Sequence, residues 1–465
     1  MSLPLHQRSI TELRNGLAAN EFRSRQLVET YLERIAAYNL RINGFVTILG
    51  ERALEQADAA DRKRAAGEPL GPLAGIPIGV KDSVPTAGVR TTSNSRVLEN
   101  WVPERNAAPV GHLLDAGAIL LGKTNLNEFG WALPNDNNLT PKALSAWNPA
   151  YAAIGSSSGS GNAVSAGFVA AAVGTDGGGS ARLPAGQNNL VSLKPTHGLV
   201  SRKGMDDSWI SEISPMTRTV EDTALMLSIM AQREPNDWNA WAMPAPDYVA
   251  NLETDVRGWK VGVPRRLVDE SGMEDEVAEA FAASLDALRA LGVELVDVEI
   301  PGLPEARMAN FVILNGQTHA GHAASLRRHP ELYGHSARVY HWMGAFLTAT
   351  DLMNAKAIAS RVQGLVQECF GNVRAFVTPT SPVVTAEAAR RPDSHRKGSN
   401  AMFTSPFNLT GHPAISVPSG FSASTGLPIG LQMVGPMHDE LTLLQLSRAL
   451  EKSGDWRARH ASIGD

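Results

Sequence analysis

Between residues 72 and 195, short apolar runs alternate with segments rich in glycine, serine and other small residues. The runs at 76–80 and 119–121 are typical of strands that are buried on both faces. Residues 107–116 between them have the pattern of a helix, and Gly117 is placed to end it. A strand–helix–strand unit of this kind forms parallel strands covered by helices. This segment therefore predicts an α/β protein.

The same pattern continues towards the C-terminus. Apolar positions between 277 and 288 recur at helical spacing, and Gly292 follows them. Short apolar runs predict further strands of the same sheet at 261–263, 295–298, 375–377, 415–417 and 430–434. We therefore predict a single large α/β body over residues 1–465, with a central mixed, mostly parallel sheet flanked by helices on both faces.

Three regions are expected within this body. Residues of about 1–70 predict helices, the first of which begins at a capping box made by Ser9 and Glu12. Residues of about 71–225 predict the catalytic core. Residues of about 300–400 are expected to be mostly helical, as an insertion or lid over the core.

Small side chains dominate residues 163–172 within the core. They predict a closely packed helix over this range. Residues 169–173 fit the end of that helix and a strand equally well, because short apolar runs do not distinguish the two.

Composition excludes several classes of protein. The chain has 465 residues with a net charge of −5, so no basic excess points to nucleic acid or to an anionic membrane. We find no signal peptide and no apolar run of the roughly 20 residues that cross a membrane, and we expect a cytoplasmic protein. The one cysteine, Cys369, cannot form a disulfide within the chain and is expected to be a small core residue at a helix end.

Two clusters of glycine and serine, at 155–161 and 175–180, follow a lysine that ends a predicted strand, Lys81. A serine hydroxyl attacks a carbonyl poorly unless a base removes its proton. Lys81 can act as that base only when it is neutral, so its pKa must fall from about 10.4 to near neutrality. Burial at the end of an apolar strand lowers a lysine pKa in this way. Three glycines before Ser180 allow a tight turn whose N–H groups can converge as an oxyanion hole.

Other roles compete for these residues. The first cluster could bind phosphate, but it lacks the Gly-Lys-Ser/Thr ending of a P-loop. Lys123 is an alternative base, although a structural role is favoured. Asp176 is expected to orient the glycine turn rather than to transfer protons. For Arg182, a structural ion pair is favoured over binding of a substrate carboxylate.

The chain has twelve histidines, which invite a metal site or a Ser–His triad, and five of them lie close together at positions 319, 322, 329, 335 and 341. They lack the HExxH pattern and an acidic partner at ligand spacing, so we expect no metal. A histidine-based triad stays open from the residues alone, although none of the histidines stands in a turn as distinctive as that of Lys81.

The order of the clusters, Lys81 followed by GSS at 155–157 and DGGGS at 176–180, resembles the amidase signature family. Ser156 and Ser180 are 24 positions apart, as the two serines of that family are. The resemblance covers nearly the whole chain. Further similar stretches lie at 122–125, 148–149, 193–196 and 215–222, and in several places between 403 and 432.

This resemblance implies a Ser–cis-Ser–Lys triad. Ser180 would be the nucleophile, and Ser156, with a cis peptide, would relay protons between Ser180 and the base Lys81. The N–H groups of the glycine turn and of the nucleophile would bind the oxyanion. The residues of that oxyanion hole are Gly177, Gly178, Gly179 and Ser180. No cofactor and no metal are implied.

The substrate pocket is less well defined by the sequence. The candidate pocket residues are Trp131, Trp209 and Phe403, of which Trp209 is favoured. A role in core packing fits each of these aromatic side chains at least as well as a role in the pocket. Residues 204–214 depart from the common family pattern, because they are shorter and lack the usual Ser-Leu-Asp-Gln run.

We expect hydrolysis of an amide-type C–N bond in a small molecule, such as an amide, anilide or carbamate, with esters as side substrates and no nucleic-acid or membrane partner. The main alternative is the glutaminase subunit of a tRNA-dependent amidotransferase, which would have a tRNA partner. Residues 204–214 argue against it, as does Ala401, where those subunits typically carry an acidic residue. A non-catalytic binding protein is a third alternative, which the intact triad positions disfavour.

Overall fold

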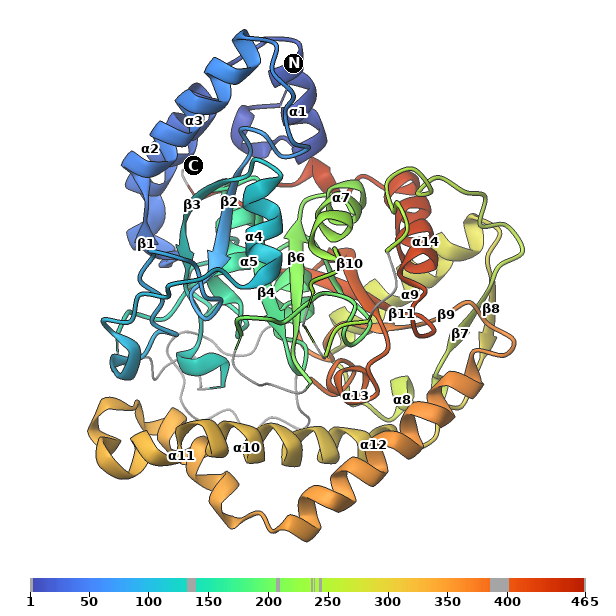
Figure 1. The fold of residues 1–465 in the computed structure, drawn as a ribbon. Coiled ribbons are helices and arrows are strands. Elements are labelled where there is room, and N and C mark those ends of the chain that lie inside the picture. Colours follow the sequence, from blue (N-terminus) through green and yellow to red (C-terminus); the bar gives the residue numbers. More distant parts are fainter. Residues whose placement is uncertain are drawn as a thin grey trace.

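The computed structural model describes residues 3–131, 139–205, 210–235, 237, 239–241, 245–384 and 401–463. These residues form one α/β body in which helices flank an eleven-stranded mixed sheet (Figure 1). The predicted fold class is confirmed.

The strands follow the predicted apolar runs, except that β1, β5 and β6 were not predicted. Their bounds are β1 (Phe45–Ile48), β2 (Pro77–Lys81), β3 (Ile119–Thr124), β4 (Ala171–Asp176), β5 (Val191–Lys194), β6 (Glu212–Thr217), β7 (Lys260–Val263), β8 (Glu294–Asp297), β9 (Ala375–Pro379), β10 (Ala414–Phe421) and β11 (Pro428–Val434).

The helices connect and cover these strands. Their bounds are α1 (Ile10–Ala18), α2 (Ser24–Ile42), α3 (Gly50–Ala65), α4 (Ala108–Asp115), α5 (Ser158–Ser165), α6 (Arg182–Gln187), α7 (Val220–Met230), α8 (Arg265–Asp269), α9 (Asp275–Ala290), α10 (Leu303–Arg328), α11 (His335–Met343), α12 (Ala349–Cys369), α13 (Ser405–Leu409) and α14 (Glu440–Ser453). Within the described ranges, no helix is both long and apolar enough to cross a membrane.

The sheet is mixed, as predicted, but it is not mostly parallel. Its order is β1-β3-β2-β4-β6-β5-β10-β11-β9-β7-β8. Parallel pairs join β3, β2 and β4 and, at the other end, β9, β7 and β8. The central pairs from β4 to β9 are antiparallel, as is β1 with β3. A short connection such as that between β10 and β11 allows antiparallel pairing, whereas a parallel pair needs a longer crossover.

The helix predicted over residues 163–172 is wrong in its bounds. The helix α5 is Ser158–Ser165, and Gly167, with a φ of 69°, follows its end. Residues 171–176 form the strand β4, which is buried along its whole length. Small apolar residues occupy both elements, and a strand buried on both faces has no alternating pattern that would separate it from a helix.

The N-terminal helices begin at the predicted signal. The Glu12 N–H donates to Ser9 Oγ at 3.1 Å, and the Ser9 N–H donates to Glu12 Oε2 at 2.6 Å, so the capping box is confirmed. Helices α2 and α3 then cover the β1 end of the sheet (Figure 1).

The predicted helical insertion consists of α10, α11 and α12, which cross one edge of the sheet (Figure 1). It ends earlier than expected, because α12 stops at Cys369 and β9 returns the chain to the sheet. Cys369 is at the helix end, as predicted, but it is only partly buried. Helix α10 packs against α12 and α13. Its Asn310 donates to the carbonyl of Gly177, the residue after β4, so α10 lies beside the carboxyl end of β4, where predicted catalytic residues lie.

Candidate active site

The Lys81 amine is the centre of the site. Lys81 ends β2 and is fully buried, and its Nζ donates hydrogen bonds to Ser156 Oγ and to Thr175 Oγ1, each at 2.7 Å. Strands β2 and β4 are parallel neighbours, so Lys81 and Thr175 both stand at carboxyl strand ends. Burial lowers the pKa of Lys81 to about 7, and the nearby Asp176 carboxylate opposes this shift. A pKa in this range allows the amine to lose its proton near physiological pH.

Ser156 lies on the segment that precedes α5. The peptide bond between Gly155 and Ser156 is cis. Ser156 is buried, and its hydroxyl faces the Lys81 amine. The Asn127 side chain approaches so closely that a Cβ at Gly155 would lie 2.4 Å from Asn127 Oδ1. This close approach explains why a glycine precedes the serine.

Ser157 joins the two serine segments to β4. Its N–H donates to the Ser180 carbonyl at 3.0 Å. Its hydroxyl donates to the Thr175 carbonyl and accepts from the Thr175 N–H, both at 3.2 Å. Ser156 and Ser180 are therefore held on neighbouring pieces of backbone, and Ser180 itself is half-exposed.

The glycine turn is fixed by its carbonyl groups. Asn310 from α10 donates to the Gly177 carbonyl at 3.2 Å, and the Thr404 hydroxyl donates to the Gly178 carbonyl at 2.7 Å. Within the described residues, the N–H groups of Gly177, Gly178 and Ser180 have no acceptor in the protein. These three groups are available to an oxyanion.

Gly179 was expected to contribute its N–H group to the oxyanion hole, but it does not. Its N–H donates to Asp176 Oδ1 at 2.7 Å and so already has an acceptor. Its φ is 120°, and a Cβ there would lie 2.3 Å from Thr404 Oγ1, so only glycine fits this position. Gly179 shapes the turn, and its N–H is not available to the substrate.

A fully buried ion pair anchors the turn. Arg182 donates from Nε to Asp176 Oδ2 and from Nη2 to Oδ1, both at 2.9 Å. Arg182 also donates to Gln432 Oε1 and Asn408 Oδ1, both at 2.6 Å. The Arg182 guanidinium holds the pKa of Asp176 well below its usual range. The structural roles predicted for Asp176 and Arg182 are confirmed.

The competing lysine points elsewhere. Lys123 on β3 pairs in register with Val80, one position before Lys81, so the two lysines project from opposite faces of the sheet. Lys123 Nζ donates to the hydroxyls of Thr86 at 2.8 Å and Thr91 at 3.0 Å, away from both serines. Burial lowers its pKa to about 7 as well. The two lysines therefore have similar pKa values, and only their positions show which of them faces the serines.

The candidate pocket aromatics have different surroundings. Trp131 follows Gly130, where a Cβ would lie 3.2 Å from Ser156 Oγ, so the start of this segment lies against the site. The Trp131 ring packs near Phe311 of α10 and is half-buried. Phe403 is fully buried, which favours core packing for it. Trp209 lies outside the described residues.

The histidine segment forms an aromatic cluster near the site. The rings of His322 and His341 stack at 4.4 Å, and Phe129 packs against both. Burial lowers the pKa of His322 to about 4 and that of His341 to about 3. Among the residues with a described placement, no group of three His, Cys, Asp or Glu side chains is arranged to hold a metal ion.

Sequence reasoning assigned no role to several residues of the site. Thr175 holds the Lys81 amine, Ser157 joins the serine segments, and Asn310 and Thr404 fix the glycine turn. The sequence could have pointed to Thr175 and Ser157, because both lie inside the two glycine–serine clusters, next to predicted catalytic residues. Asn310 comes from a distant helix, and no local pattern marks it.

Comparisons with known proteins identify the family of the chain. The family model described as Amidase matches residues 26–444. A curated relative, a subunit of glutamyl-tRNA(Gln) amidotransferase from Roseiflexus sp. (strain RS-1), is 37% identical over 485 residues, which cover 98% of each chain.

Solved structures extend the comparison. A crystal structure of an amidase is 30% identical, with a TM-score of 0.86 over 96% of this chain and 99% of that chain. The corresponding glutamyl-tRNA(Gln) amidotransferase subunit from Thermotoga maritima is 29% identical, with a TM-score of 0.83 over 98% of this chain and 96% of that chain. The chain belongs to the amidase family, the amidase signature enzymes. It is accordingly a hydrolase that acts on C–N bonds.

The buried ion pair predicts a large loss of stability when it is broken. Asp176→Asn leaves the Arg182 guanidinium buried without its counter-charge, and we expect the free energy of unfolding to fall by about 3–5 kcal/mol. Urea unfolding measures this change. Asp286→Asn is the control, because its ion pair with Arg289 is exposed and should contribute little. Similar small losses in both variants would contradict the anchoring role of Asp176.

Proposed function

We propose that the protein hydrolyses amide-type C–N bonds of small, uncharged molecules through an acyl-enzyme on Ser180. Ser156 relays protons, and Lys81 is the base. The observation that carries this proposal is the fully buried Lys81 amine, 2.7 Å from Ser156 Oγ, with a pKa of about 7. At that pKa the amine can accept a proton at neutral pH and return it in a later step.

The first half of the reaction forms the acyl-enzyme. Neutral Lys81 takes the Ser156 hydroxyl proton as Ser156 takes the proton of Ser180, and Ser180 Oγ attacks the carbonyl carbon. The negative charge on the carbonyl oxygen is met by the N–H groups of Gly177, Gly178 and Ser180. One such donor typically contributes about 3 kcal/mol to stabilising the transition state.

The proton then returns through Ser156 to the leaving nitrogen. The C–N bond breaks, and a neutral amine departs from the acyl-enzyme. Water attacks the ester carbonyl with the same proton relay, which releases the carboxylic acid and restores the Ser180 hydroxyl. No cofactor or metal enters these steps.

The lowered Lys81 pKa predicts how activity depends on pH. Below about pH 7 the Lys81 amine is protonated and cannot accept a proton, so kcat/KM should rise with pH and level off above about 7. Thr175→Val removes an acceptor that favours the charged amine, and the rising limb should move to lower pH.

Thr86→Val is the matched control, because Thr86 accepts the same kind of bond from the buried Lys123. Its pH profile should stay in place. If Thr86→Val moves the rising limb and Thr175→Val does not, Lys123 is the base and the proposed assignment is wrong.

The relay role predicts a difference between amides and esters. Ser156→Ala should reduce amide hydrolysis more than hydrolysis of a matched activated ester, because an amine leaving group must be protonated and an activated alcohol need not be. The ratio of kcat/KM for the two substrates measures the effect. Ser157→Ala is a control, since it removes a neighbouring hydroxyl that binds only backbone groups. Equal losses on both substrates in Ser156→Ala would exclude the relay.

The substrate class follows from the surroundings of the glycine turn. Among the described residues, the side chains nearest to a Cβ built at Gly177 or Gly178 belong to Ser211, Asn310, Leu314 and Ser405, and none of these four is charged. The nearby charges of Asp176 and Arg182 are buried and satisfy one another. The Arg202 guanidinium lies beyond the four side chains and donates to the Ser211 carbonyl at 3.0 Å. The four uncharged neighbours therefore support an uncharged acyl group more than the ammonium of a glutamine, which would need a carboxylate partner.

The second candidate is glutamine hydrolysis for a tRNA-dependent amidotransferase, and the curated relatives favour it. Several relatives named as subunits of glutamyl-tRNA(Gln) amidotransferase are 34–37% identical over nearly the whole chain. A glutamine ammonium needs a carboxylate partner. Ala401 provides none. Its carbonyl accepts from the Thr404 N–H at 3.2 Å, and the Thr404 hydroxyl in turn donates to the Gly178 carbonyl. We therefore place small-molecule hydrolysis, without tRNA, ahead of the glutaminase.

A hydrolysis panel separates the two functions. The panel contains an aliphatic amide, an anilide, a carbamate, an ester and L-glutamine, each with Ser180→Ala as the inactive control. We expect turnover of at least one uncharged amide-type substrate and weak turnover of glutamine. Ala401→Asp should raise glutamine turnover by supplying a carboxylate, whereas the isosteric Ala401→Asn should not.

Other outcomes would overturn the proposal. Glutamine as the best substrate of the unchanged protein would favour the amidotransferase function. Retained turnover in Ser180→Ala would exclude Ser180 as the nucleophile for any substrate.

A further inference from the structure

A short segment after β3 lies between the proposed catalytic centre and the helical insertion. It is the 3-10 helix η3 (Glu128–Gly130). On one side of it, a Cβ at Gly130 would lie 3.2 Å from Ser156 Oγ and 4.0 Å from Lys81 Nζ. The φ of Gly130 is 74°, a conformation that favours glycine. The Gly130 backbone therefore lies against the hydroxyl and the amine of the proposed relay.

The other side of η3 packs against the insertion. The centroid of the Phe129 ring lies 4.2 Å from that of His322 in α10 and 5.4 Å from that of His341 in α11. The ring of Tyr333, between these two helices, lies 5.6 Å away. Phe129 has a φ of 52°, which is uncommon for a bulky side chain. Such a conformation persists only where the surrounding contacts hold it.

The Glu128 carboxylate joins the elements on both sides of η3. Its side chain is fully buried. Ser95 Oγ donates to Glu128 Oε1 at 2.6 Å, and the Gly334 N–H, immediately before α11, donates to Oε2 at 2.9 Å. Ser95 belongs to the loop that follows β2, the strand that ends at Lys81. One carboxylate therefore ties η3 to the loop after β2 and to the start of α11.

We propose that Glu128 is a positioning residue for the hydrolytic reaction, because it holds the Gly130 backbone against Ser156 and Lys81 and so keeps water away from the Lys81 amine. Glu128 acts through Gly130 and does not itself bond to the reacting groups. This inference rests on the proposed function, in which Lys81 is the base. It gives the insertion a second contact with the site, besides the one that Asn310 makes with the glycine turn.

The exclusion of water has a measurable consequence at Lys81. Burial is the main cause of its lowered pKa, and the Asp176 carboxylate opposes the shift. An amine that regains contact with water regains the hydration of its charged form, so its pKa rises towards the ordinary value. Loss of the Glu128 charge alone would not raise this pKa, because a negative charge favours the protonated amine. A rise therefore reports lost cover and not lost charge.

The titratable groups that pack against η3 from the insertion stay neutral around pH 7. Burial lowers the pKa of His322 to about 4 and that of His341 to about 3. Burial raises the pKa of Tyr333, and the Glu128 charge adds to this shift. None of these three side chains changes its charge in the range where Lys81 titrates.

Titration of the Lys81 amine in the full chain tests this inference. NMR with isotope-labelled lysine follows the side-chain carbon next to each amine, and Lys81→Met assigns the Lys81 signal. Glu128→Ala should move the Lys81 midpoint upward by about one pH unit, because the amine becomes partly hydrated. The rising limb of kcat/KM should move with it, which lowers the rate below the midpoint about tenfold. Glu128→Gln should restore the midpoint, since its amide can accept from Gly334 and donate to Ser95.

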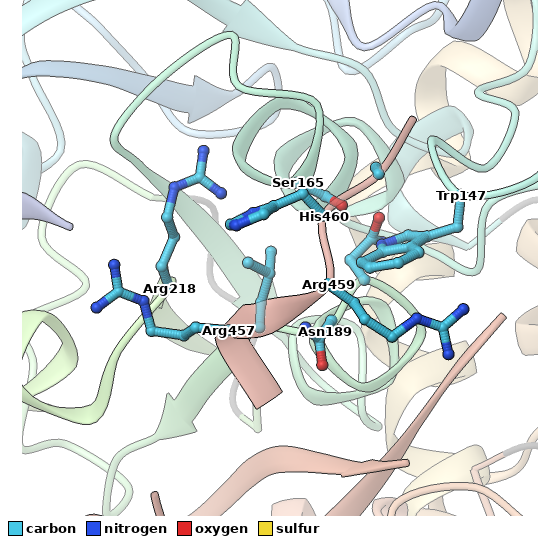
Figure 2. A pocket seen from close by; sticks show the side chains of 10 residues that line it. Trp147, Ser165, Asn189, Arg218, Arg457, Arg459 and His460 are labelled. Atoms are coloured by element: carbon cyan, nitrogen blue, oxygen red, sulfur yellow. The ribbon is translucent and has the colours of Figure 1, made fainter. Parts of the chain in front are cut away.

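Two variants serve as controls. Glu440 of α14 is also a buried glutamate that accepts from a backbone N–H, that of Thr196 at 2.7 Å. Asn189 lines the pocket at the ends of α5 and α6, the helices that follow the two serines, and donates to the Trp456 carbonyl at 2.7 Å (Figure 2). Glu440→Ala and Asn189→Ala each remove a buried hydrogen bond without uncovering Lys81, so the Lys81 midpoint should stay in place.

Ser95→Ala covers the case in which Glu128→Ala does not fold. It removes one of the two hydrogen bonds and should move the Lys81 midpoint in the same direction by a smaller amount. An unmoved midpoint in both variants, or an equal shift in Glu440→Ala, would overturn the positioning role and leave the proposed function intact. A raised midpoint with an unmoved kcat/KM profile would support the positioning role and overturn Lys81 as the base.

Discussion

The burial of the Lys81 amine is the constraint on which the rest of the site depends. A lysine at the end of a solvent-exposed strand would keep its charge and could not accept a proton near neutral pH. Here β2 lies between β3 and β4, and the amine has two hydroxyls as its only hydrogen-bond partners among the described residues. The cost of desolvation lowers its pKa to about 7. Lys81 therefore has the proton affinity that the proposed relay needs.

Two buried arginines show how the fold uses positive charge. Arg182 lies in a fully satisfied network with Asp176, Asn408 and Gln432, and this network holds the glycine turn in place. Arg218 is also buried, donates to the His6 carbonyl, and has the Asp222 carboxylate near enough to favour its charge. A buried charge whose hydrogen bonds are all satisfied can hold a turn rigidly. The Arg182 network therefore supports the amidase site.

Much of the fold could be predicted from local patterns. The capping box at Ser9 and the strand that ends at Lys81 depend on neighbouring residues, and both are present. The bounds of α5 and β4 were missed because small apolar residues suit a helix and a buried strand alike. The antiparallel centre of the sheet and the contact of Asn310 with Gly177 join residues far apart in the chain, so no local pattern reveals them.

The sequence by itself determined the amidase family, the two serine clusters and two lysines that each end an apolar run. The residues alone left both lysines open as the base, and only the family resemblance implied Lys81. Both lysines are buried with pKa values of about 7, but Lys81 and Lys123 stand at alternate positions of paired strands. Successive side chains of a strand point to opposite faces, so the pairing register of β2 and β3 directs one amine towards Ser156 and the other towards Thr86 and Thr91. The tertiary structure decided this, because register exists only once the strands have paired.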